Sequence, residues 1–241
     1  MSDETLSPQL ESWIEVAADS DFPIQNLPLG VFESSEGRHA ATIVGDTVID
    51  LHALSNAGLL AGVPDSRLLQ QPSLNAFLER GRTTGSALRA RLSHLLRRDG
   101  DASLREIATG ELLRERDGVS MLVPVVIGDY VDFYSSLEHA TNLGRLFRPG
   151  GDPLLPNWRW IPIGYHGRSA TVQIDGETVV RPKGQRKAPD VQAPTFGPST
   201  MLDIELEMGF VTGHGNARSV PIPVHEAERH IAGLVLVNDW S

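Results

Sequence analysis

The chain has 241 residues, of which 40% are hydrophobic and 22% are charged, and its formal net charge is −10. This length can bury a full core as one large or two modest domains, and the composition excludes disorder of the whole chain. The negative charge argues against a nucleic acid or an anionic membrane as partner, because both are bound through clustered Lys and Arg. The absence of cysteine excludes disulfides, thiolate nucleophiles and cysteine-ligated zinc.

The first residues, Met-Ser-Asp-Glu-Thr, are acidic, whereas a secretory signal carries positive charge followed by an apolar stretch. No apolar run approaches the roughly 18 residues of a membrane-spanning helix. We therefore expect a soluble, cytoplasmic protein that binds neither a membrane nor a nucleic acid.

The N-terminal part begins with short strands. Three are predicted, at residues 29–34, 38–44 and 47–51. The last two are joined by Gly45-Asp46, a two-residue loop suited to a tight hairpin. Together with the helices that follow, these strands predict a small β-barrel-like domain over residues 1–118.

Helical signals follow the strands. Ser73 is placed to cap a helix over residues 74–80. A longer helix is predicted to run to about Arg98, because four leucines fall on one face: Leu88, Leu92, Leu95 and Leu96. No constellation with an evident chemical role lies in this part of the chain.

From residue 119 the pattern becomes mainly β. Residues 119–127 form a nearly continuous apolar run, which is typical of a buried strand. Asp175-Gly176 favours a hairpin between strands at 171–174 and 177–181. Two more strands are predicted at 201–210 and 233–238, and a short helix at 224–231. We expect residues 119–241 to form a second, β-rich domain, so that the whole chain is α+β.

The strand at 201–210 alternates between apolar and acidic residues. Its even positions from Leu202 to Phe210 are apolar and are expected to pack inward, so Asp203, Glu205 and Glu207 point the other way. One interpretation is the solvated face of an edge strand. The other is a cation site, because like charges at i and i+2 repel unless a cation neutralises them. Carboxylate oxygens alone select a hard ion such as Mg²⁺ or Ca²⁺.

Further carboxylates could join this site. Asp239 closes the predicted strand at 233–238, where it could be a metal ligand or could equally form an Asx-type turn. Asp129 and Asp132 both lie in the loop after the run at 119–127, and spacing does not choose between them.

His139 is the best candidate for a general base, because the ordinary pKa of histidine suits proton transfer near neutral pH. A purely structural histidine is the alternative. His225 and His230 flank Glu226, but their i, i+5 spacing puts the rings on different faces of a helix and excludes the zinc-helix motif.

Taken together, several strings resemble the fumarylacetoacetase family in order and spacing. They are DYVDFYSSLEHATNLG (129–144), LPNW (155–158), PIGYHGR (162–168), DIELEM (203–208) and NDWS (238–241). The resemblance implies a small SH3-like barrel over residues 1–118. It implies the first part of a mixed β-sandwich or roll catalytic domain over residues 119–241.

The resemblance also implies a reaction, the metal-dependent hydrolysis of the carbon–carbon bond of 4-fumarylacetoacetate to fumarate and acetoacetate in tyrosine and phenylalanine catabolism. It matches His139 to the water-activating base, and it matches Tyr134, Arg148 and Tyr165 to substrate-binding positions. It matches four carboxylates to ligands of Mg²⁺ or Ca²⁺: Asp132, Glu205, Glu207 and Asp239. The small-molecule substrate is a β-diketo acid, and the full-length protein is expected to be a homodimer.

In that family the chain continues past the NDWS string, and the continuation carries the oxyanion-stabilising residues and the carboxylate that orients the histidine. The sequence therefore predicts a C-terminally truncated chain that is inactive alone, because loss of one oxyanion donor already costs on the order of 10²–10³ in rate. Two alternatives stay open. One is a non-catalytic fragment that serves as a binding or interaction remnant, and the other is a related acylpyruvate hydrolase or keto-acid decarboxylase.

Overall fold

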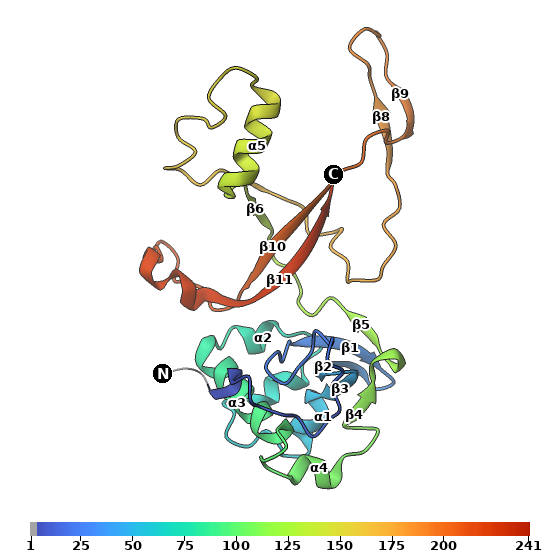
Figure 1. Cartoon of the computed structure of the whole chain (residues 1–241), viewed down its shortest axis with the longest axis vertical. Coiled ribbons are helices and arrows are strands. Elements are labelled where there is room, and N and C mark those ends of the chain that lie inside the picture. The colour runs from blue at the N-terminus through green and yellow to red at the C-terminus, as the bar shows by residue number, and fades with distance from the viewer. Residues whose placement is uncertain (1–3) are drawn as a thin grey trace. The chain divides into compact units, whose positions relative to one another are not determined.

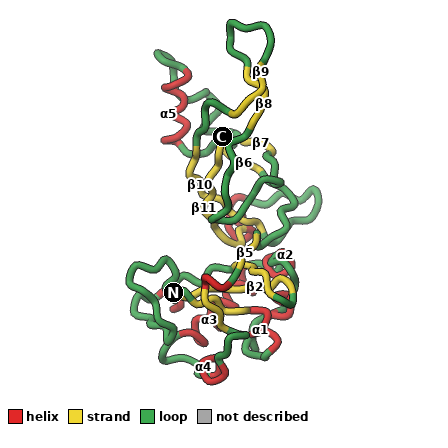
Figure 2. The backbone as a smooth tube through the Cα atoms, turned by 90° about the vertical axis from the view of Figure 1, so that its right-hand side faces the viewer, coloured by secondary structure: helices red, strands yellow, loops and turns green. Residues whose placement is uncertain are grey.

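The computed structural model describes residues 4–241. Its backbone divides into two compact units, one of Met1–Val125 with Ile174–Ser241 and the other of Val126–Gln173 (Figures 1 and 2). The structure contains both helices and antiparallel sheets, so the α+β prediction is confirmed. None of the helices in the described residues combines the length and the apolar character that crossing a membrane needs.

The N-terminal part contains a five-stranded antiparallel sheet in the order β4-β3-β2-β1-β5. Its strands are β1 (Gly30–Ser34), β2 (Gly37–Val44), β3 (Thr47–Asp50), β4 (Leu113–Glu115) and β5 (Ser120–Leu122). The three strands predicted from the sequence are β1 to β3. Gly45 at the β2–β3 turn has a φ of 57°, a conformation that glycine adopts without steric cost. Closure of the sheet into a barrel stays a prediction.

Helices lie to the left of and below this sheet in Figure 1. The α-helices are α1 (Leu51–Asn56), α2 (Asn75–Leu78), α3 (Arg82–Leu96) and α4 (Ser103–Ile107). The 3-10 helices are η1 (Glu4–Leu6), η2 (Ser66–Gln70) and η3 (Arg116–Gly118). All four leucines predicted to share a face of α3 are buried, which confirms that helix. Ser73 was predicted to cap a helix, but Leu74 occupies the N-cap of α2, and burial of its side chain in the core accounts for the shift.

One face of the sheet packs on the main hydrophobic core. Side chains from strands and helices meet there, including Val31, Ile49, Leu54, Phe77, Leu92 and Leu95. The opposite face carries a smaller apolar cluster of Phe32, Ala41 and Val48. The N-terminal part therefore has its own core.

The buried strand predicted at residues 119–127 is wrong in extent and in burial. Only Ser120–Leu122 pair with β1, and none of these three residues is buried. This strand lies at the edge of the sheet, and Pro124 beyond it has no N–H to continue the ladder. The Pro124 carbonyl instead accepts a hydrogen bond from the Leu74 backbone N–H at 2.9 Å. The domain boundary at residue 118 stays a prediction, although β5 belongs to the N-terminal sheet.

The C-terminal segment forms a long antiparallel hairpin of β10 (Ile204–Thr212) and β11 (Ile231–Trp240), connected through the 3-10 helix η4 (Val224–His230). The alternation predicted for β10 is present, but the prediction that its apolar face packs inward is wrong. Leu206 is 76% exposed and Leu236 of β11 is 74% exposed, whereas the acidic face is half-buried. Neither strand pairs with any other described strand, and the large apolar side chains of this face are exposed.

Two further hairpins are short. β8 (Lys183–Arg186) pairs with β9 (Thr195–Pro198). In the second unit β6 (Val131–Phe133) pairs with β7 (Gly164–His166), and the helix α5 (Leu137–Phe147) lies between them in the sequence. Asp175-Gly176 forms a turn as predicted, but the flanking residues form no strands.

Leu92 is expected to be important for the stability of the N-terminal part. Its side chain is 1% exposed within α3, so Leu92→Ala leaves a cavity in the main core. We expect the free energy of unfolding to fall by about 2–5 kcal/mol. Urea denaturation checks this, with the exposed Leu6→Ala as control. Equal midpoints for both variants and the wild-type chain would contradict the described core.

His52 predicts a pH dependence of stability. Burial and the neighbouring imidazole of His39 lower the pKa of His52 from 6.5, so the folded chain takes up this proton less readily than the unfolded chain. Its contribution to stability is therefore complete above pH 6.5 and is lost as the pH falls below that value. Thermal unfolding at pH 7.5 and pH 5 should show a smaller loss of Tm for His52→Gln than for wild type. An equal loss in both chains would count against this role.

Candidate metal centre

The pairing of β10 with β11 brings three carboxylates to one face of the hairpin. Glu205 and Glu207 lie two residues apart on β10, and Asp239 of β11 is directly opposite Glu205. Residues directly opposite in an antiparallel pair have Cβ atoms about 4.5–5.5 Å apart and share a face. All three carboxylates are half-buried. Like charges so close together repel one another, and a divalent cation would neutralise them.

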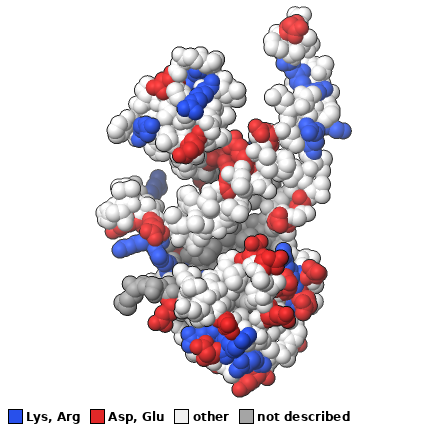
Figure 3. All heavy atoms as spheres, in the orientation of Figure 1, with Lys and Arg blue, Asp and Glu red and all other residues white. Residues whose placement is uncertain are grey.

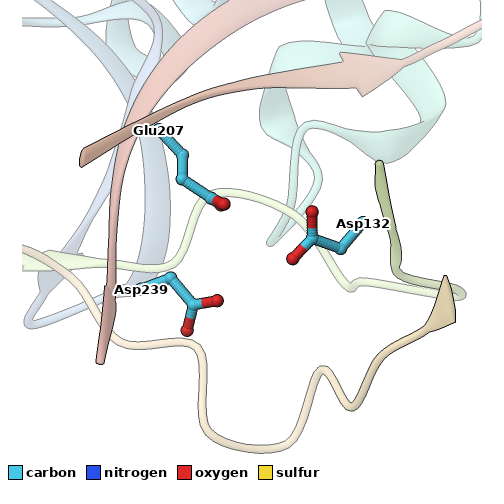
Figure 4. A group of neighbouring side chains, drawn as sticks. All are labelled: Asp132, Glu207 and Asp239. Carbon is cyan, nitrogen blue, oxygen red and sulfur yellow. The ribbon is translucent and has the colours of Figure 1, made fainter. Parts of the chain in front are cut away.

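Asp132 adds a fourth carboxylate from β6. It is half-buried, it faces Tyr165 of β7 in the register, and its Oδ2 accepts a hydrogen bond from the Tyr165 hydroxyl at 2.7 Å. One carboxylate oxygen from each of Asp132, Glu207 and Asp239 lies within 4.8 Å of the others (Figure 4). Glu205 is outside this group of three in the described residues. Three of the four predicted ligands thus offer an oxygen-only donor set, which suits a hard divalent ion.

Asp129 and Asp132, which sequence spacing did not distinguish, have different partners. Asp129 contacts the Nε2 atom of His166 and accepts a hydrogen bond from the Tyr130 backbone N–H at 3.0 Å. The hydrogen bond with His166 is the main cause of a lowered pKa of Asp129, and the hydrogen bond from the Tyr130 backbone lowers it further. The Asp129–His166 pair was missed from the sequence, although His166 lies in the quoted PIGYHGR string.

The N-terminal end of α5 positions His139. The Ser136 side chain caps the helix by accepting a hydrogen bond from the His139 backbone N–H at 3.3 Å. The His139 ring contacts Tyr134 edge-to-face, with the ring centroids 5.8 Å apart. The Tyr134 hydroxyl donates to the Ala140 carbonyl at 3.1 Å, which ties this tyrosine to the first turn of the helix. The predicted base and one predicted substrate-binding tyrosine are therefore held together.

Arg148 follows the last turn of α5. Its guanidinium donates to the backbone carbonyls of Asp152 and Pro153. Gly144 allows this loop to approach the helix, because a Cβ at that position would lie 1.8 Å from the Pro153 carbonyl oxygen. In this structure the Arg148 fork, which was predicted to bind a substrate carboxylate, holds the loop after the helix.

Charge is mixed elsewhere on the molecule. Figure 3 shows acidic and basic side chains interspersed over the visible face of the described residues. The acidic group on the hairpin is distinguished by its shared face and by its partial burial, which most surface carboxylates do not have.

Comparison with known proteins finds two family profiles that match successive parts of the chain. The family profile "Fumarylacetoacetase N-terminal" matches residues 25–124, and "Fumarylacetoacetate (FAA) hydrolase C-terminal" matches residues 130–241. The second profile spans β6, α5 and the whole acidic hairpin. Fold and candidate site thus define a hydrolase-family chain with an N-terminal and a C-terminal type of domain.

Individual relatives agree. The chain is 44% identical to the fumarylacetoacetase of Arabidopsis thaliana over 242 residues. This alignment covers 96% of the chain and 56% of the relative. It is also 42% identical over 241 residues to two other fumarylacetoacetases. The alignment with that of Caenorhabditis elegans covers 96% of the chain and 57% of the relative, and the alignment with that of Homo sapiens covers 95% of the chain and 56% of the relative. The chain belongs to the fumarylacetoacetase family, and it spans about half the length of the curated relatives it matches.

Removing one carboxylate from the hairpin should weaken binding of a divalent cation. We expect Glu207→Gln to raise the Kd for Mg²⁺ or Ca²⁺ at least about tenfold, because ligand charge is a main determinant of affinity at oxygen sites. Isothermal titration calorimetry measures this. Glu177→Gln makes the same chemical change at an exposed turn and should leave the Kd unchanged. Equal weakening by both variants would indicate only a diffuse effect of charge.

Proposed function

We propose that this chain contributes the metal ligands and the general base for hydrolysis of the carbon–carbon bond of 4-fumarylacetoacetate to fumarate and acetoacetate. The observation that carries the proposal is the shared, half-buried face of Glu205, Glu207 and Asp239 in a segment matched by the fumarylacetoacetate hydrolase profile. The match to fumarylacetoacetases at 42–44% identity supports this reaction over that of a related acylpyruvate hydrolase or keto-acid decarboxylase.

We propose Asp132, Glu205, Glu207 and Asp239 as the residues that hold Mg²⁺ or Ca²⁺. The donor set fits either ion, since both prefer carboxylate oxygens. A bound divalent ion would polarise the substrate carbonyl and stabilise the negative charge that develops on oxygen. The Tyr165 hydroxyl donates to Asp132, so it orients this carboxylate as well as offering an aromatic wall for substrate.

His139 is proposed to take a proton from the attacking water. The helix cap at Ser136 and the edge-to-face contact with Tyr134 hold this side chain at the start of α5. A restrained orientation favours proton transfer, because a general base must lie within hydrogen-bond reach of the proton that it accepts. Tyr134 is thus proposed both to position His139 and to contact substrate.

Arg148 is proposed to bind the carboxylate of the diketo acid with its bidentate fork. The same guanidinium now donates to the carbonyls of Asp152 and Pro153. Substrate binding would therefore exchange backbone carbonyls for a carboxylate, which is the stronger, charge-assisted acceptor. This exchange would couple substrate binding to the position of the loop after α5.

We further propose that residues 119–241 are the first part of the catalytic domain and that the full-length protein is a cytoplasmic homodimer. The separate profile matches to 25–124 and 130–241 support a change of domain between residues 124 and 130, a few residues after the boundary predicted from the sequence.

The proposal is tested by following the loss of diketone absorbance with Mg²⁺ or Ca²⁺ present, together with calorimetric binding of the substrate. Any turnover should disappear on chelation of the metal. In the full-length protein, His139→Gln should lower kcat at least about 100-fold while substrate still binds, since a general base contributes typically 10²–10⁴. His225→Gln, at an exposed histidine of η4, is the matched control.

Substrate binding decides the ligand assignments independently of turnover. We expect binding to require the metal and to weaken in Glu207→Gln. Binding or turnover that persists after chelation, or that is unaffected by both variants, would contradict the proposed site.

A further inference from the structure

A second group of polar side chains lies on the smaller apolar face of the N-terminal sheet, outside the residues proposed for the metal centre. It consists of Ser34 at the end of β1, His39 on β2 and Asp50 at the end of β3. The His39 Nδ1 atom is 2.7 Å from Asp50 Oδ2, and the His39 Nε2 atom is 3.2 Å from Ser34 Oγ. Serine, histidine and aspartate therefore form a continuous hydrogen-bonded chain.

The direction of the protons follows from the chemistry of the three groups. A carboxylate oxygen can only accept, so the proton between His39 and Asp50 is on Nδ1. The Nε2 atom then carries a lone pair, to which the Ser34 hydroxyl donates. This is the arrangement in which an imidazole acts as base toward a serine hydroxyl while a carboxylate fixes its tautomer.

Other contacts hold the three groups in place. The Asp50 Oδ1 atom accepts from the Ala53 backbone N–H at 2.8 Å and so caps α1. Arg114 of β4 brings a positive charge to 3.9 Å from Asp50 Oδ2. The Glu36 backbone N–H donates to Ser34 Oγ at 3.1 Å, which fixes the serine rotamer.

The imidazole of His39 is also covered on its sides. The ring of His52 stacks on it with centroids 4.1 Å apart, and the ring of Phe32 meets it edge-on. Burial and the presence of His39 lower the pKa of His52, which favours the neutral form of the His52 ring. The two neighbouring rings thus shield the His39 imidazole from water.

Exposure increases in the order that a reactive serine requires. The side chain of Asp50 is fully buried and that of His39 is 6% exposed, whereas Ser34 is half-buried. Ser34 is followed by the exposed turn residues Ser35 and Glu36, so a small molecule can approach it from the turn. The Glu36 carboxylate beside this approach favours neutral over anionic reactants.

We propose that Ser34, His39 and Asp50 form a second reactive centre that transfers acyl groups from small neutral carboxylic esters. Ser34 Oγ forms a bond to the ester carbonyl carbon as its proton moves to His39 Nε2. The carbon–oxygen bond to the alcohol then breaks, and His39 returns the proton to the leaving alcohol. Water, deprotonated by His39, hydrolyses the acyl-serine and regenerates the hydroxyl. This centre goes beyond the proposed diketone hydrolysis and does not rest on it.

The test uses the complete chain and a neutral dialkyl fluorophosphonate, which gives a stable serine adduct with release of fluoride. We expect peptide mass spectrometry to show modification of Ser34 at least about 100-fold faster than of Ser35, an exposed neighbour to which the described residues offer no histidine partner. Ser34→Ala should abolish this modification, and Ser35→Ala should leave it unchanged.

Asp50→Asn separates reactivity from structure. Asparagine keeps an oxygen that can cap α1, but its amide N–H₂ favours the other histidine tautomer, in which Nε2 carries the proton and cannot accept from Ser34. We expect modification of Ser34 to slow at least about 100-fold with unchanged far-UV circular dichroism. The proposal is overturned if Ser34 in the folded wild-type chain reacts no faster than Ser35, or if a folded Asp50→Asn chain reacts as wild type does.

Discussion

The candidate metal centre depends on the register between β10 and β11. This register sets Asp239 opposite Glu205 and leaves Glu207 on the same face. Because side chains alternate with a period of two, a slip of one residue would send the carboxylates of one strand to the opposite face from those of the other. The backbone ladder, and not proximity in sequence, therefore assembles the acidic face. Glu205 and Glu207 of β10 need the pairing with β11, which brings Asp239, to form a site.

The same register creates the exposed apolar face of the hairpin. Leu206 and Met208 of β10 lie beside Asn238 and Leu236 of β11 on the face opposite the carboxylates. A two-stranded hairpin has marginal stability alone, since it needs a packed face for support. Burial of this apolar face would therefore add to the stability of the hairpin, because Leu206 and Leu236 are largely exposed. Any interaction that covers it would also hold the carboxylates in register.

Much of the local structure was predictable. Gly45-Asp46 and the leucines of α3 predicted their elements, because turn chemistry and helical periodicity act over a few residues. Burial was less predictable, since it depends on what packs against an element. The apolar run that begins at Val119 became a three-residue edge strand, and the apolar face of β10 stayed exposed. The same limit applied to the site: sequence showed that Glu205 and Glu207 share a face, but strand pairing was needed to place Asp239 beside them.

The group Ser34–His39–Asp50 was invisible to sequence motifs because three strands contribute to it. Two successive hairpins, with Phe32 opposite His39 and Ala41 opposite Asp50, put all of these side chains on one face of the sheet. Asp50 uses one oxygen to cap α1 and the other to hold His39. Loss of its charge would thus act on the imidazole, while loss of both oxygens would also weaken the helix. Fold and reactivity can be separated at Asp50 only by a side chain that keeps the first oxygen, as asparagine does.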